Sequence, residues 1–375
     1  MTDPRVERHA KVLVDYCVRA EEGDRILIEG TPQAEPLIRA VFRHLLEAGA
    51  HPVLGLTLTG LETGAGVDDV FMAEASDEQL EFTPPLVLQA YQTFEGRIRI
   101  HSQTNTKALT NIEPSRMARR ASGIAPILRA QFERGGAGAF KWVTTLHPTQ
   151  AYAQDAEMSL DEYEDFVYAA CHVDRDDDDP VAHWTSVQQE QARVLQALKG
   201  KGAVHVQGPH CDLTLSVKDR VFMNSSGRFN FPDGEIYTGP VEDSADGWVR
   251  FTYPSQRLGR EVNGVELHFE QGRVTSATAD KNEAYLLKTL DTDAGSRYLG
   301  EFAIGTNYGI QRYTGNILFD EKIGGSFHVA LGSGYPETGS TNVSAIHWDM
   351  ICDLRKDSVI TFDDEEVYRD GSFTV

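Results

Sequence analysis

Six side chains of the kinds that bind divalent metal ions lie in separate segments of the C-terminal part of the chain. They are Glu235, Glu301, His328, Tyr335, His347 and Asp349. In a β-strand, the spacing of His347 and Asp349 points both side chains to the same face, where one cation could contact both. Carboxylates combined with imidazoles suit zinc, cobalt or manganese, and two neighbouring cations need a shared carboxylate plus separate ligands. The residue types therefore predict a metal site that the fold must assemble.

Each of these six residues also has a purely structural explanation when it is taken alone. The glutamates suit an exposed turn and a helix cap, and the histidines suit hydrogen-bonded core positions. The tyrosine suits aromatic packing, and the aspartate suits the surface of a strand. Only the combination of all six favours a metal site.

Two other kinds of metal protein are compatible with part of the set. His328, His347 and Asp349 match the two-histidine, one-carboxylate pattern of mononuclear non-haem iron oxygenases. Glu235 and Glu301 favour two cations instead, because a mononuclear iron site does not need them. A non-catalytic protein stabilised by metal is the other alternative, but structural sites are usually closed and four-coordinate. The sequence has no HExxH or GxSxG motif and no cysteine-protease signature.

The elements that must position these residues differ between the two halves of the chain. The first half alternates between helix-like and strand-like segments. Helices are predicted over residues 6–20, 34–48 and 117–132, and strands over residues 25–30, 51–58, 94–101 and 140–146. This order is typical of βαβ units, and it predicts an open α/β domain with a parallel sheet over residues 1–200.

After a predicted helix at residues 184–198, the second half has the residue pattern of β-strands. Alternating or β-rich segments follow one another with glycine and asparagine turns between them. They cover residues 203–208, 212–217, 247–253, 262–269 and 273–279, and one helix is predicted at 282–290. We therefore expect a mainly β (α+β) metal-binding domain over residues 201–375.

The composition narrows the class of protein. The 375 residues include 35 basic and 57 acidic side chains, which give a formal net charge of −22. Such a negative field repels nucleic acid and anionic membrane surfaces. No run of about 18 uncharged apolar residues is present that could cross a bilayer. The charged N-terminus lacks the apolar core of a signal peptide, so we expect a cytoplasmic protein. From the net charge we expect no nucleic-acid or membrane partner.

Two further features have plain structural interpretations. The four cysteines are far apart and form no CxxC pair, which favours reduced, mostly buried thiols. They are Cys17, Cys171, Cys211 and Cys352. The acidic block at residues 174–179 lacks the glycine and terminal glutamate of an EF-hand, so it favours a solvated loop over a calcium site.

The segments that carry the six residues resemble those of a known family. They read NFPDGEIYTGP at residues 230–240, LGEFAIGTN at 299–307, GGSFHVALGSGY at 324–335 and HWD at 347–349. On these segments the chain resembles the thermophilic metallo-aminopeptidase family, also called the aminopeptidase T group. The likeness runs nearly end to end, beginning with residues 11–14 and 26–30. At all six positions the residue is of the type that the family uses to bind metal.

This resemblance implies an α/β N-terminal domain joined to a C-terminal metal-binding domain, in a homodimer with an enclosed active site. It also implies two divalent metal ions per chain, commonly zinc or cobalt, with manganese and magnesium as alternatives. The implied activity is the removal of N-terminal residues from short peptides that have a free N-terminus. The oxygenase and the non-catalytic protein remain the competing hypotheses.

The chemistry of the implied reaction suggests different roles for the six residues. The residues expected to be metal ligands alone are Glu235, His328, His347 and Asp349. Glu301 and Tyr335 are expected to be ligands that also take part in the reaction. Glu301 is the first choice for the acid that passes a proton to the leaving amine. Because a carboxylate engaged by metal ions is a poor base, Glu242 is kept as an alternative.

Overall fold

The computed structural model describes the whole chain except residues 1–2, 62, 176–178 and 258, so the middle of the acidic block at 174–179 lies outside the described residues. Contacts divide the chain into two compact units. Unit 1 comprises Met1–Trp184 and Gly227–Pro232, and unit 2 comprises Thr185–Ser226 and Asp233–Val375. The domain boundary predicted at residue 200 stays a prediction.

Unit 1 is built on a five-stranded sheet in which every pairing is parallel. In spatial order its strands are β2 (His51–Leu56), β1 (Arg25–Gly30), β3 (Gly96–His101), β4 (Lys141–Leu146) and β8 (Asn230–Phe231). The β-branched residues of the central strands, such as Ile26, Ile98 and Val143, are fully buried, as in other parallel sheets covered by helices. The predicted α/β fold with a parallel sheet is confirmed.

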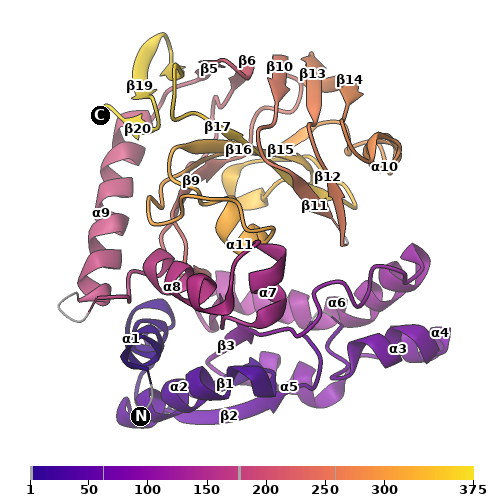
Figure 1. Cartoon of the computed structure of the whole chain (residues 1–375), viewed down its shortest axis with the longest axis vertical. Helices are drawn as coiled ribbons and strands as arrows, with labels where there is room; N and C mark the ends of the chain where they lie inside the picture. The colour runs from indigo at the N-terminus through magenta and orange to yellow at the C-terminus, as the bar shows by residue number, and fades with distance from the viewer. Residues whose placement is uncertain (1–2, 62, 176–178, 258) are drawn as a thin grey trace. The chain divides into compact units, whose positions relative to one another are not determined.

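Helices connect the strands of unit 1 (Figure 1). They are α1 (Pro4–Val12), which continues into the π-helical turn η1 (Leu13–Cys17), η2 (Pro32–Ala34), α2 (Glu35–Glu47), α3 (Asp68–Glu74), α4 (Asp77–Glu81), α5 (Pro85–Thr93), α6 (Pro114–Gly136), α7 (Gln150–Asp155) and α8 (Leu160–Ala170). In α2 the buried residues Leu37, Val41 and Leu45 recur every four positions, which is the spacing that predicted this helix. The short helices α3, α4, α5 and α7 and the longer α8 were not predicted.

Unit 2 consists mainly of two antiparallel sheets. One has the order β14-β13-β10-β6-β5-β18-β19-β20 and the other the order β17-β16-β15-β9-β7. The strands are β5 (Ala203–Gly208), β6 (Cys211–Ser216), β7 (Met223–Ser225), β9 (Glu235–Thr238), β10 (Asp246–Arg250), β13 (Glu266–Glu270), β14 (Arg273–Thr278), β15 (Leu299–Gly305), β16 (Ser326–Gly332), β17 (His347–Asp353), β18 (Val359–Phe362), β19 (Glu365–Arg369) and β20 (Ser372–Phe373).

Smaller elements complete unit 2. β11 (Ser255–Arg257) and β12 (Arg260–Val262) form a two-stranded ribbon, and the helices are α10 (Glu283–Leu290), α11 (Ile317–Asp320) and the 3₁₀ turn η3 (Pro336–Thr338). The boundary between the units falls inside α9 (Pro180–Leu198). The predicted helices at 184–198 and 282–290 correspond to α9 and α10.

The core of unit 2 lies between its two large sheets, which form two layers in Figure 1. Phe302, Phe327 and Val329 from the five-stranded sheet meet Leu213 and Leu267 from the eight-stranded sheet. Because strand residues alternate between faces, burying these side chains turns their neighbours to the opposite face of the five-stranded sheet. That opposite face carries the polar residues described below.

All four cysteines are buried and free, which confirms that prediction. Among the described residues, no helix combines the length and the apolar character needed to span a lipid bilayer.

Candidate metal centre

Five of the six predicted ligands project from one face of the five-stranded sheet in unit 2. Their strand neighbours Ile236, Phe302, Phe327, Trp348 and Met350 all lie in the core between the sheets. The period of two along a strand therefore turns the polar residues together to the other face. These residues are Glu235 on β9, Glu301 on β15, His328 on β16, and His347 and Asp349 on β17.

The register of the strands places small side chains between the polar ones. Ala330 pairs with Glu301 on one side and with Asp349 on the other. Ala303 pairs with His328 on the neighbouring strand. A methyl group fills little of the space between adjacent strands, so the longer carboxylate and imidazole side chains converge above it.

A β-bulge next to Glu301 depends on a glycine. The register between β15 and β16 shifts between Leu299 and Glu301. A Cβ atom at the intervening Gly300 would lie 2.4 Å from the carbonyl oxygens of Gly332 and Ser333. Only glycine fits this close approach of two strands, and the bulge sets the face to which Glu301 points.

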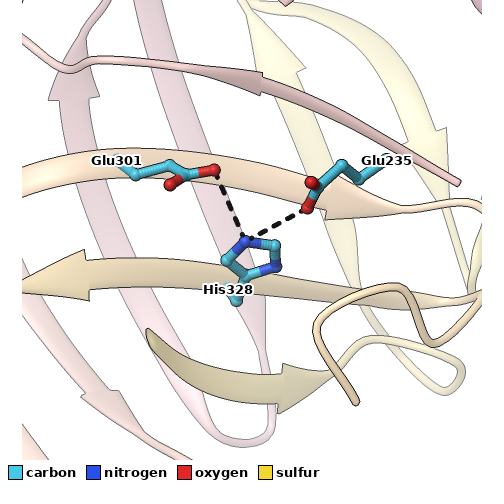
Figure 2. A group of neighbouring side chains, drawn as sticks. All are labelled: Glu235, Glu301 and His328. Atoms are coloured by element: carbon cyan, nitrogen blue, oxygen red, sulfur yellow. Dashed lines mark ion pairs between the residues drawn. The ribbon is translucent and has the colours of Figure 1, made fainter. Parts of the chain in front are cut away.

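His328 lies between the carboxylates of Glu235 and Glu301 (Figure 2). Its Nε2 atom is 3.4 Å from Oε2 of Glu235 and 3.7 Å from Oε1 of Glu301. All three residues are buried. Their ligand atoms lie within 4.8 Å of one another, so a single cation could contact all three.

His347 forms a second group with Glu301 and Asp349. Its Nε2 atom is 3.3 Å from Oε2 of Glu301 and 3.4 Å from Oδ1 of Asp349. Its Nδ1 atom lies 2.7 Å from the carbonyl oxygen of Ser333. A carbonyl oxygen only accepts hydrogen bonds, so Nδ1 carries the proton and is the donor. When this imidazole is neutral, that bond leaves the lone pair on Nε2, where a metal ion would bind.

The two groups share Glu301 and nothing else. Oε1 of Glu301 faces His328, and Oε2 faces His347. One carboxylate oxygen thus belongs to each group, so Glu301 could supply a ligand atom to each of two cations. The spacing of His347 and Asp349 that the sequence emphasised is one half of this arrangement.

Unsatisfied buried atoms show that the residues present fit a bound cation. Oε2 of Glu235 and Oδ1 of Asp349 are buried and have no hydrogen-bond partner among the described residues. Leaving buried polar atoms in this state is costly, because such atoms are normally paired. A divalent cation at these donor sets would satisfy both oxygens.

The carboxylates draw protons onto the imidazoles of the cation-free chain. Burial opposes a charged imidazole, but Glu301, Glu235 and Asp349 raise the pKa of His328 to about 9. Against the same effect of burial, Asp349 and Glu301 raise the pKa of His347 to about 12. Burial raises the pKa of Glu235 to about 8. The positive charge that this cluster attracts is the charge that a metal ion would supply.

Tyr335, the sixth predicted residue, follows β16 and lies beside the second group. Its ring centroid is 5.1 Å from that of His347 and 5.5 Å from that of Tyr237. The residue is 39% exposed, and partial desolvation of its ring, followed by the negative charge of Glu301, raises the pKa of its phenol above the ordinary value. The hydroxyl is therefore protonated in the cation-free chain, and it is able to donate a hydrogen bond.

Two charged residues of the cluster were not predicted from the sequence. Nζ of Lys322 lies 3.1 Å from Oε1 of Glu235 and also pairs with the carboxylate of Glu321. Glu321 in turn forms a third group with His328 and Asp349. Burial opposes the charge of Lys322, but Glu235 and Glu321 hold its pKa well above the ordinary value. The available signal was the Glu-Lys pair just before the glycines of the His328 segment.

Glu242, the alternative base, bonds to other partners. Its carboxylate accepts hydrogen bonds from Arg220 at 2.6 Å and from the backbone N–H of Thr341 at 2.6 Å. Burial raises the pKa of Glu242, but the hydrogen bonds from Thr341 and the charge of Arg220 help to outweigh it and leave the pKa below its usual value. A carboxylate held in this way is a weak proton acceptor.

Comparisons with known proteins agree over nearly the full length of the chain. The model of the thermophilic metalloprotease (M29) family matches residues 2–373. Aminopeptidase 2 from Geobacillus stearothermophilus is 25% identical, over 99% of this chain and 98% of its own length. The structure of wild-type AmpT from Thermus thermophilus has a TM-score of 0.82 at 21% identity and covers 99% of both chains.

A second solved structure is similar in fold. 2,5-Dihydroxypyridine dioxygenase from Pseudomonas putida KT2440 has a TM-score of 0.58 at 14% identity, over 99% of this chain and 97% of its own. The fold is thus common to proteins whose names denote different reactions. The donor groups and the family match carry more weight than the fold in choosing between these reactions.

Proposed function

The chain belongs to the thermophilic metalloprotease (M29) family, and we propose that it is a metal-dependent aminopeptidase that uses two divalent cations per chain. Its substrates would be short peptides with a free N-terminus. The family match supports the metal-dependent peptidase, and the relative's name supports the exopeptidase activity. The number of cations is inferred from the geometry of the donor groups.

The division of Glu301 between two donor groups is the observation that carries this proposal. Each group contains one histidine and one carboxylate of its own, and Glu301 supplies an oxygen to both. The residues that would hold the cations are Glu235, Glu301, His328, Tyr335, His347 and Asp349. When bound, two cations polarise the scissile carbonyl and lower the pKa of a water molecule toward neutrality.

The chain's own residues would position and move protons in this reaction. The Tyr335 hydroxyl would donate a hydrogen bond to the carbonyl oxygen as negative charge develops there. Glu301 is the proposed proton acceptor, and this role requires one of its oxygens to be released from its donor group, because a carboxylate engaged by a metal ion is a poor base. Glu242 is the weaker candidate, since Arg220 and Thr341 already engage its carboxylate.

The competing oxygenase needs both histidines and one carboxylate on a single iron. Each of the three donor groups found among the described residues contains one of the two histidines and never both. This separation favours the peptidase. The non-catalytic alternative is disfavoured because the donor groups are rich in carboxylates, unlike the usual four-coordinate structural sites.

A dipeptide assay tests the activity. Metal-free protein supplied with zinc or cobalt should release the first residue from an unblocked dipeptide and leave the N-acetylated dipeptide intact. Equal cleavage of both peptides, or no cleavage with any divalent metal, would contradict an aminopeptidase.

The metal content of the purified protein tests the number of cations. A value near two per chain supports the shared role of Glu301. A value near one, with iron as the metal, favours the oxygenase instead.

The finer features of this proposal come from the resemblance and the sequence. Zinc or cobalt is the proposed metal, with manganese or magnesium as alternatives. The protein is proposed to be a cytoplasmic homodimer. Size-exclusion chromatography with light scattering would test the oligomeric state.

A further inference from the structure

One lysine is buried beside the proposed metal centre. The side chain of Lys322 has an exposed fraction of 0%, and its Nζ contacts Oε1 of Glu235 and the carboxylate of Glu321. Within the described part of the chain, no other lysine or arginine forms an ion pair with a carboxylate of the centre. Burying an ammonium group is unfavourable unless it has such partners. The pairing therefore indicates a specific role.

The positive charge of Lys322 is favourable when the centre is empty and unfavourable when a cation is bound. The centre has four carboxylates, from Glu235, Glu301, Glu321 and Asp349, and among the described residues Lys322 is the one permanently charged cation that pairs with them. In the empty centre, Lys322 offsets part of the repulsion among buried carboxylates. With cations bound, the same ammonium would repel them.

The contacts of Lys322 are confined to one of the two donor groups. It holds Oε1 of Glu235, so Oε2 is the oxygen that faces His328, at 3.4 Å, without a hydrogen-bond partner. Among the described residues it forms no ion pair with Asp349, the carboxylate that belongs to the second of these two groups and not to the first. An effect of Lys322 on metal binding should therefore fall mainly on the group of Glu235, Glu301 and His328.

We propose that Lys322 is a positioning residue that serves as a built-in counter-ion of the metal centre. It stabilises the empty centre and restricts Glu235 to one available oxygen, and it lowers the affinity for the cation held by Glu235, Glu301 and His328. This inference rests on the proposed function, because it concerns the same metal centre. It adds to that function a residue that sets how tightly one of two cations is held.

The test compares Lys322→Met with Lys141→Met, using cobalt(II) chloride alone as the probe. Lys141 is the control, since its Nζ pairs with Asp24 at 2.9 Å in unit 1 and neither residue belongs to a donor group. In Lys322→Met, the melting temperature should fall more for the EDTA-treated protein than for the cobalt-loaded protein. In a calorimetric titration, one of the two cobalt ions should bind on the order of tenfold more tightly. Lys141→Met should lower both melting temperatures equally and leave both affinities unchanged.

A double variant keeps the test decisive if the single variant folds poorly. Lys322→Met with Glu321→Gln removes one charge of each sign, so its cobalt affinities should return close to those of the unmodified chain. Lys322→Arg should also behave like the unmodified chain. A single variant that folds only with cobalt present supports the counter-ion role.

Other outcomes would overturn the inference. Equal destabilisation of the empty and loaded forms of Lys322→Met would mean that the lysine is merely structural. Weaker cobalt binding in the double variant would mean that Glu321 is a metal ligand rather than the partner of Lys322. If the unmodified chain binds no divalent cation, the proposed function fails, and this result is distinct from the other two.

Discussion

Each unit of the molecule buries a cluster of charged side chains, and the two clusters are built differently. In unit 1, Oε2 of Glu29 accepts a hydrogen bond of 2.8 Å from Nε of Arg99. Tyr91 donates to Glu29 and accepts from Arg99 at 3.0 Å. Arg97 lies nearby and donates to Gln131 and to backbone oxygen. This cluster has enough positive charge for its carboxylate.

The cluster in unit 2 lacks that balance. It has several carboxylates but only Lys322 as a permanent cation, and two of its carboxylate oxygens have no hydrogen-bond partner among the described residues. Both clusters are buried, so burial alone does not distinguish a structural ion pair from a binding site. The carboxylate oxygens without a hydrogen-bond partner and the excess of negative charge distinguish the cluster in unit 2 as a binding site.

The largest expected effect is that of Glu301→Gln in unit 2. This change removes the charge that both donor groups share, so kcat/KM should fall about a thousandfold or more. The far-UV circular dichroism should be unchanged, because the amide occupies the same volume. Dipeptide hydrolysis measures the loss, and Glu29→Gln is the matched change in unit 1, for which activity per folded molecule should be retained. Full activity of Glu301→Gln would contradict the role assigned to Glu301.

Arg99→Met should have the next largest effect, this time on stability rather than activity. It leaves Glu29 buried without its main ion-pair partner, which typically costs about 3–5 kcal/mol in the free energy of unfolding. Denaturant titration measures this, and Arg39→Met is the control, because the exposed pair of Arg39 with Glu35 is worth well under about 1 kcal/mol. Similar losses for the two variants would show that the unit 1 cluster is not the closed, stabilising pair that it resembles.

Removal of metal should destabilise the sheet of the unit 2 cluster and not that of the unit 1 cluster, with a smaller effect than the two substitutions. A cation present at a hundred times its Kd stabilises the folded state by about 2.7 kcal/mol, and EDTA removes that contribution. Hydrogen exchange should therefore accelerate in β15, β16 and β17 and stay the same in β1 and β3. Equal acceleration in both sheets would contradict a metal centre confined to unit 2.

The sequence predicted unit 1 better than the sheet that carries the site. The predicted strand at residues 25–30 coincides with β1, and the helix predicted at 34–48 with α2, because a βαβ unit has strong local periodicity. β15 and β16 are buried on both faces, so polar ligands and core residues alternate without an exposed side. The usual contrast between buried and exposed positions is absent there.

The candidate site was predicted through the identity of its segments rather than through their geometry. Only the pairing of His347 and Asp349 follows from local spacing. The division of Glu301 between two groups depends on strand register and on a bulge, neither of which is encoded in a short stretch of residues. Lys322 was missed because a lysine is normally exposed, and only the fold shows that this one is buried between two carboxylates.

The smallest expected effect is the pH dependence of the unit 1 cluster. Burial raises the pKa of Glu29, but Arg99 and Arg97 outweigh it and leave the pKa below 4.5, its ordinary value. A lowered pKa means that the unfolded chain binds the proton more readily, so the stability due to Glu29 is present above pH 4.5 and is lost as the pH falls through the folded pKa. Each pKa unit of lowering corresponds to about 1.4 kcal/mol.

The difference in unfolding free energy between the unmodified chain and Glu29→Gln should therefore be constant from pH 7 to about 5 and shrink below that. Hydrogen exchange of peptides from β1 and β3, measured on EDTA-treated protein, isolates this change from loss of metal in unit 2. A difference that stays constant down to the acid limit of folding would show that Glu29 is not held ionised by its arginines.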